Sequence, residues 1–214
     1  MQIQSSKEQV LARIRTALQG HTPVPFSDER AQIAEVIEAP YDEDLGIVFA
    51  ERLIEAKGQL IYCASATEMA ANLKAIIKDK NWRHVYVWEK DLQDFLQRHD
   101  IREGRIGRQL DRAEVGLTTC EALIARTGSV LISNRSASGR TLSIFPPVHI
   151  VLAHRGQLVY DIEEGINRAV RLAGKQMPSM LSLTTGPSRT ADIEKTLVEG
   201  AHGPKELYVL FLDR

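Results

Sequence analysis

The stretch Val148-His-Ile-Val-Leu-Ala153 decides the fold, because its apolar residues run on almost without alternation. Such a run is typical of a strand that is buried on both faces, as in a parallel sheet covered by helices. Apolar runs and amphipathic segments follow one another on both sides of it, with short connections. We therefore predict an α/β fold with three α/β/α layers and a mostly parallel central sheet.

The segments around this stretch alternate between two periodicities. Short apolar runs predict strands over residues 59–64, 84–88, 115–118, 129–133, 181–185 and 206–212. Helical spacing predicts helices or helical turns over residues 42–57, 67–80, 91–98, 120–126, 161–173 and 189–197. In sheets of this kind ligands bind beyond the carboxyl ends of the strands. Polar turns that follow strands are therefore the candidate sites.

The N-terminal segment differs from the rest. Residues 5–19 have the spacing of an amphipathic helix, with apolar side chains at Val10, Ile14 and Leu18. Two prolines then argue against regular structure. We expect residues 1–39 to form a helix and linker, and residues 40–214 to form the α/β domain. The helix either covers an open face of the same core or packs on a partner chain.

Composition and charge exclude several classes of function. The 27 Lys and Arg residues balance 28 Asp and Glu residues, so we predict no binding to nucleic acid or to a membrane surface, and any anion site must be local. The absence of a secretion signal and of an apolar run of roughly 18 residues predicts a cytoplasmic protein. The two cysteines lack a CxxC spacing. Because no metal-binding or nucleotide motif is present either, we expect no metal and no other cofactor.

One polar turn is the first candidate for a ligand or anion site, and its residues are Thr185, Gly186, Pro187, Ser188, Arg189 and Thr190. Gly186 permits close approach of a ligand to the backbone. If a helix follows, its free N–H groups and the guanidinium of Arg189 attract an anion. The alternative is an ordinary helix cap, in which Asp192 satisfies the helix dipole and pairs with Arg189.

A second candidate follows the strand at 115–118. Thr118 and Thr119 end this strand, and we place Glu121 in a first helical turn, where a carboxylate favours the dipole. If Glu121 points instead into a ligand cleft at the carboxyl ends of the strands, it is a candidate catalytic base. Cys120 lies beside it, but no histidine has a spacing that pairs with it as a nucleophile requires.

Further candidates lie in the loop from Ser133 to Arg140, which is small, polar and basic as a binding loop would be. Ser143 follows this loop. His149 lies inside an apolar strand, where it is either a hydrogen-bonded core residue or a ligand contact. His202 lies in the turn before the last strand. It is either an ordinary turn residue or a residue that faces the ligand cleft.

Three long segments together resemble a known family. They read GLTTCEALIARTGSVLIS at 116–133, SGRTLSIFPPVHIVLAHRGQLVYDIEEGI at 138–166 and SLTTGPSRTADIEKTLVEGAHGPKELYVLFLD at 182–213. Across residues 40–213 the chain is similar to the lactate-utilisation (LUD) domain of the LutC/YkgG type. The resemblance implies a fold similar to NagB, RpiA and the CoA transferases.

The resemblance also implies a role in oxidising L-lactate to pyruvate with two partner proteins, one iron–sulfur and one ferredoxin-like. This chain would be the subunit without an iron–sulfur centre, with a cleft for a small anionic ligand. The resemblance identifies no catalytic residue, so it does not decide whether the chain is an enzyme. The chain could also form a homo-oligomer. Two alternative functions stay open. One is a regulatory or scaffold module that docks through its N-terminal helix. The other is an isomerase- or transferase-like enzyme, with Glu121 as base and Arg189 holding a phosphorylated or CoA-like ligand.

Overall fold

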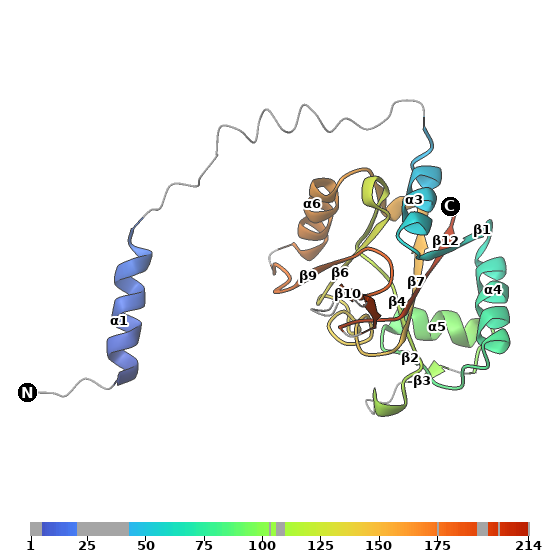
Figure 1. The fold of residues 1–214 in the computed structure, drawn as a ribbon, viewed down its shortest axis with the longest axis horizontal. Helices are drawn as coiled ribbons and strands as arrows, with labels where there is room; N and C mark the ends of the chain where they lie inside the picture. The colour runs from blue at the N-terminus through green and yellow to red at the C-terminus, as the bar shows by residue number, and fades with distance from the viewer. Residues whose placement is uncertain are drawn as a thin grey trace, which may run out of the picture. The chain divides into compact units, whose positions relative to one another are not determined.

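The computed structural model describes residues 6–20, 43–102, 104–105, 110–174, 176–191, 197–200 and 202–213. The chain divides into two compact units, Met1–Glu38 and Ala39–Arg214. In the first unit the described element is α1 (Ser6–Leu18), which confirms the predicted N-terminal helix (Figure 1). None of its residues is buried. No helix in the described part of the chain is long and apolar enough to span a membrane.

A six-stranded sheet forms the centre of the second unit, and every pairing in it is parallel. In spatial order its strands are β1 (Gln59–Cys63), β12 (Glu206–Leu212), β7 (Val148–His154), β4 (Val115–Thr118), β2 (Val85–Val87) and β3 (Gly104–Arg105). The predicted α/β class and the mostly parallel sheet are therefore confirmed. The strand β7, whose continuous apolar run predicted this fold, lies inside the sheet between β12 and β4.

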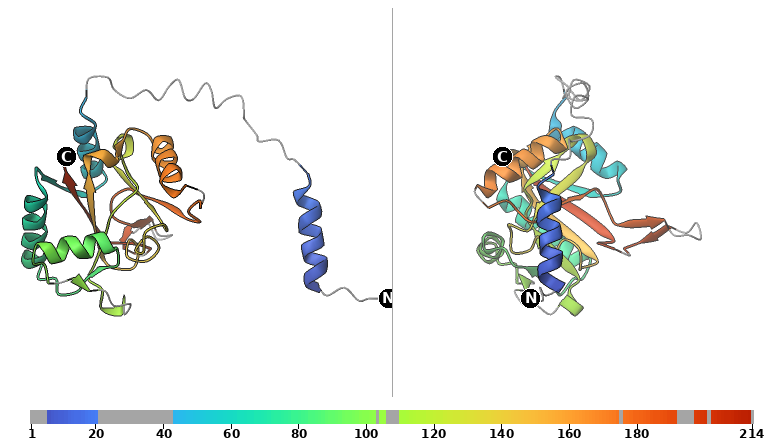
Figure 2. Two further views of the ribbon diagram at one scale, coloured as in Figure 1. Left: turned by 180° about the vertical axis from the view of Figure 1, so that it is seen from behind. Right: turned by 90° about the vertical axis from the view of Figure 1, so that its left-hand side faces the viewer.

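Helices cover one face of this sheet, and a helix together with a second sheet covers the other (Figures 1 and 2). The first face packs on α4 (Ala66–Asp79) and α5 (Lys90–Arg98). The second face packs on α3 (Leu45–Glu55). Alternate residues of β7 enter the two cores, as the pleat of a strand requires; Ile150 belongs to the first and Val151 to the second.

The second sheet has four strands, in the order β8 (Leu158–Val159), β5 (Ala122–Ile124), β6 (Ser129–Ser133) and β9 (Leu181–Thr184). Its central strand β6 runs antiparallel to both β5 and β9. The helix α6 (Ile162–Ala173) covers its outer face, where Ala169 packs against Ala122 and Ile124. The sequence predicted β6 and β9 as strands but did not separate them from the main sheet, because periodicity reports burial and not the pairing partner.

Two predicted helices are wrong. Residues 120–126 contain β5 and the start of a short 3-10 turn, η2 (Ala125–Thr127). The ends of the segment 189–197 belong to β10 (Arg189–Ala191) and β11 (Leu197–Glu199), which pair antiparallel. In both segments pairing with another strand overrides the local helical spacing. Consequently no helix begins at Arg189, and the helix N-terminus that was expected to attract an anion does not exist. Two further 3-10 turns are η1 (Leu110–Arg112) and η3 (Arg155–Gln157).

Candidate functional site

A polar pocket of about 640 Å3 collects many of the predicted site residues. We call it the turn pocket. The predicted residues that line it are Ser143, Thr185, Gly186, Pro187, Ser188, Arg189 and His202. They come from the end of β9, from the loop before β7 and from the loop before β12. The fold therefore brings the loop around Ser143 next to two later segments, 182–189 and 202–204, which are about 40 and 60 residues further along the chain. Thr190 lies in β10, and its side chain is outside the described residues.

The turn pocket lies at the amino ends of the parallel strands, and not at their carboxyl ends as we expected. The N–H of Ser188 donates to the carbonyl of Pro204 at 2.8 Å, and that of Lys205 donates to Pro147 at 2.7 Å. Pro147 and Pro204 precede β7 and β12. The expectation failed because β9 belongs to the second sheet, so its end does not join the carboxyl edge of the first.

The turn is fixed against the end of α3. Gly186 has a φ of 67°, and a Cβ there would lie 2.1 Å from the carbonyl oxygen of Ala56. Only glycine fits so close to another backbone segment. Gly186 thus permits close contact with the protein's own backbone at Ala56, whereas we had expected it to permit close approach of a ligand. The Nη2 group of Arg189 donates to the same oxygen at 2.7 Å. This oxygen lies at the C-terminal end of α3, where a positive charge interacts favourably with the helix dipole. Arg189 is exposed, so the rest of its donor fork is open to a ligand.

The lining of the turn pocket can bind an anion without a helix N-terminus. Arg189 offers charged N–H donors, and the hydroxyls of Thr185 and Ser188 can donate as well. Thr185 also shares a 2.6 Å hydrogen bond with Ser129 of β6, which holds its side chain in place. His202 is exposed and adds an imidazole. The hydroxyl of Ser143 is buried and donates to the carbonyl of Gly139 at 3.1 Å, so it contributes to the wall.

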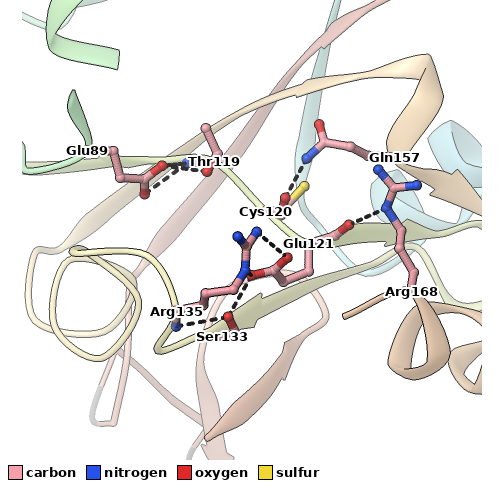
Figure 3. A network of polar contacts seen from close by, with 8 residues as sticks. All are labelled: Glu89, Thr119, Cys120, Glu121, Ser133, Arg135, Gln157 and Arg168. Atoms are coloured by element: carbon pink, nitrogen blue, oxygen red, sulfur yellow. Dashed lines mark hydrogen bonds and ion pairs between the residues drawn. The ribbon is translucent and has the colours of Figure 1, made fainter. Parts of the chain in front are cut away.

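Glu121 and Ser133 do not line the turn pocket but bind each other (Figure 3). Glu121 precedes β5 and is almost fully buried. It accepts from the Ser133 hydroxyl at 2.6 Å and from Nη2 of Arg135 at 3.0 Å. The hydrogen bond to Glu121 is the first cause that raises the pKa of Arg135. Because both carboxylate oxygens already have partners, these contacts favour a structural role for Glu121, and its role as a base stays a prediction.

A second buried carboxylate, Glu89, joins the carboxyl ends of β2 and β4 (Figure 3). It follows β2 and accepts hydrogen bonds from the N–H and the hydroxyl of Thr119, which follows β4. Sequence reasoning missed both Glu89 and Arg135. The signal for Glu89 was available, because an acidic residue directly after a predicted strand lies at the expected edge.

Cys120 lies between these two carboxylates and is not a reactive thiol. Burial is the first cause that raises its pKa, and the charges of Glu121 and Glu89 add to it. A thiol under these conditions stays protonated, whereas a nucleophilic cysteine requires the thiolate.

The remaining predicted residues lie in two other places. Nε2 of His149 and the Thr118 hydroxyl are 2.9 Å apart, and both residues are fully buried. Burial lowers the pKa of His149 to about 3, so it is neutral near pH 7, as a core histidine would be. Nη2 of Arg140 donates to the Ser179 hydroxyl at 2.5 Å. Among the described residues, no three His, Cys, Asp or Glu side chains are grouped as metal ligands.

Comparison with known proteins gives consistent matches. The model of the LUD domain family matches residues 94–212. The chain is similar to lactate utilization protein C of Anoxybacillus flavithermus, with 35% identity over 130 residues, which are 58% of each chain. With the protein of the same name from Deinococcus radiodurans it shares 37% identity over 103 residues, or 48% of each chain. The chain thus matches only about half the length of these relatives.

A solved structure shares the fold. It is the crystal structure of a DUF162 family protein from Deinococcus radiodurans, with a TM-score of 0.56 and 23% identity. The alignment covers 78% of this chain and 96% of the other.

Proposed function

Because this chain belongs to the LUD domain family, we propose that it is the subunit without an iron–sulfur centre in a system that oxidises L-lactate to pyruvate. The observation that carries the proposal is the similarity to relatives named lactate utilization protein C. The oxidation releases two electrons and two protons, and the electrons pass to an iron–sulfur protein and a ferredoxin-like protein. The sequence resemblance to the LutC type agrees with this assignment.

The proposed contribution of this subunit is to bind a small anionic ligand in the turn pocket. The ligand carboxylate pairs with the exposed guanidinium of Arg189, and the hydroxyls of Thr185 and Ser188 hydrogen-bond to it. Support comes from the lining of the pocket, which gathers these groups from a turn held against α3 and against the loop before β12. L-Lactate and pyruvate both carry the single carboxylate that this chemistry suits.

The experiment combines growth and capture. A strain that lacks the gene should not grow on L-lactate, and the wild-type chain should restore growth. The purified chain should retain the two partner proteins in a pull-down from lactate-grown cells. Normal growth of the deletion strain, together with capture of neither partner, would contradict the proposed role.

One observation favours a second function, in which α1 docks the chain on a partner. The apolar side chains of α1 are exposed, namely Val10, Leu11, Ile14 and Leu18. A helix of 13 residues has marginal stability by itself in water, and burial of such an apolar face stabilises it. Removal of residues 1–20 should abolish capture of the partners and leave L-lactate affinity intact. Unaltered capture by the shortened chain would exclude this function.

A further inference from the structure

A second hollow with a basic rim shares no lining residue with the turn pocket. Its volume is about 660 Å3, and its charged and aromatic lining residues are Lys74, Lys78, Trp82, Arg83, Asp100 and Arg102. We call it the basic hollow. The residues come from the second half of α4, from the turn before β2 and from the segment that follows α5. Its size falls within the range of small-molecule sites, roughly 300–1,000 Å3.

The charges around the basic hollow are not balanced locally. Four cations line it against one carboxylate, Asp100, which accepts from Nε of Arg102 at 2.8 Å. Glu114 accepts from the backbone N–H of Arg83 at 2.7 Å, but within the described residues the side chains of Lys74, Lys78 and Arg83 form no ion pair. This excess stands out because the whole chain has a net charge of -1. A bound polyanion would neutralise it.

The arrangement of the cations is unfavourable without a ligand. Lys74 and Lys78 are four residues apart on α4, and like charges at this spacing destabilise a helix. Both Arg102 and Lys74 lower the pKa of the Asp100 carboxyl, with Arg102 as the larger cause. Among the residues that line the hollow, cations therefore outnumber acids by four to one.

An aromatic ring gives the basic hollow a second type of contact. Trp82 is partly buried against the core, where its ring meets Tyr208 edge-on at 5.9 Å between centroids. Trp82 and Ile77 also line the hollow. A planar group can stack on an indole ring in such a position, while the cations beside it hold negative charge. Inorganic anions use only the second of these contacts.

We propose that the basic hollow binds a nucleotide, with the phosphates at Lys74, Lys78 and Arg83 and the base against Trp82. This site is separate from the turn pocket and does not depend on the proposed role in lactate oxidation. A nucleotide bound there would make the chain responsive to a second ligand.

Fluorescence of the full chain tests this site, because Trp82 and Trp88 are its only two tryptophans. In the Trp88→Phe variant the emission reports Trp82 alone. ADP should quench it saturably, and inorganic pyrophosphate should bind more weakly because it lacks a base. Lys78→Gln and Arg83→Gln should each weaken ADP binding roughly tenfold, as expected for one charge-assisted hydrogen bond.

The matched control is Arg171→Gln, which removes the same charge from an exposed position on α6. It should change ADP affinity by less than about twofold, and so should Arg189→Gln in the turn pocket. Absence of saturable quenching would overturn the proposal. Equal weakening in the control, equal affinity for pyrophosphate and ADP, or binding of poly-glutamate in place of ADP would overturn it as well.

Discussion

Replacement of Gly186 by alanine tests the fixed geometry of the turn pocket. The residue has a φ of 67°, and a non-glycine residue in such a strained conformation costs about 1–3 kcal/mol. The new Cβ would also lie 2.1 Å from the carbonyl oxygen and 3.0 Å from the carbonyl carbon of Ala56. These are backbone atoms at the end of α3, so relief requires a shift of the turn, and overpacking of this kind costs about 1–3 kcal/mol more. We therefore expect Gly186→Ala to destabilise the protein by about 2–6 kcal/mol.

Gly174→Ala is the comparison for a positive φ without a steric contact, because a Cβ at Gly174, with φ 61° and ψ -119°, would meet no atom within 4 Å. This substitution should lower the free energy of unfolding only by the cost of placing alanine at a positive φ. Urea unfolding with linear extrapolation measures both free energies of unfolding. Gly186→Ala should also weaken anion binding, since a displaced turn breaks the hydrogen bond from Arg189 to Ala56. A Gly186→Ala variant destabilised by less than about 1 kcal/mol would refute the close approach of the turn to α3.

Three further predictions concern the buried polar groups. Arg135→Gln leaves the buried carboxylate of Glu121 without its cation and should cost about 1.5–3 kcal/mol, because Arg135 is half-exposed and the Ser133 hydroxyl stays in place. Glu121→Gln leaves a half-exposed guanidinium and should cost about 1 kcal/mol. Urea unfolding that gives the reverse order would contradict the assignment. The pKa of His149 falls from 6.5 to about 3 on folding, so the unfolded chain takes up the proton first and stability is lost as the pH drops below 6.5. Between pH 7 and pH 5 the His149→Gln variant should therefore lose about 2 kcal/mol less stability than the wild type, and equal losses would show that His149 is not buried and neutral. Burial raises the pKa of both Cys63 and Cys120, so a thiol reagent at pH 8 should label them only at the rate of unfolding; fast labelling of the native protein would argue against their burial.

The sequence predicted five of the six strands of the main sheet, because each of these five carries its own apolar signal, whereas the two-residue strand β3 was not predicted. The strand at Val148–Ala153 is a continuous apolar segment and the helix predicted at 67–80 is a periodic one, and burial of their apolar faces decides their structure. The same signal failed for residues 120–126 and 189–197. There the strands β5 and β10 exist because a distant or adjacent strand pairs with them, and spacing within one segment does not reveal its partner.

The candidate site was predictable in its residues but not in its position. Thr185, Ser188 and Arg189 were chosen for their chemistry, and they do line a pocket with His202. Their place at the amino ends of the strands follows from the second sheet, which no local pattern indicated. Arg135 was overlooked since its partner Glu121 lies 14 residues away and had been assigned to a helix.

The most direct measurement for the central claim is calorimetric titration of the full chain with L-lactate, for the wild type and for Arg189→Gln. Arg171→Gln serves as the charge-matched control on α6, and urea unfolding checks that each variant is folded. We predict saturable binding to the wild type and to the control, and roughly tenfold or greater weakening in Arg189→Gln, because one charge-assisted contact to the carboxylate is lost. Equal L-lactate affinity in all three proteins, or no binding to any of them, would contradict a small-anion site in the turn pocket.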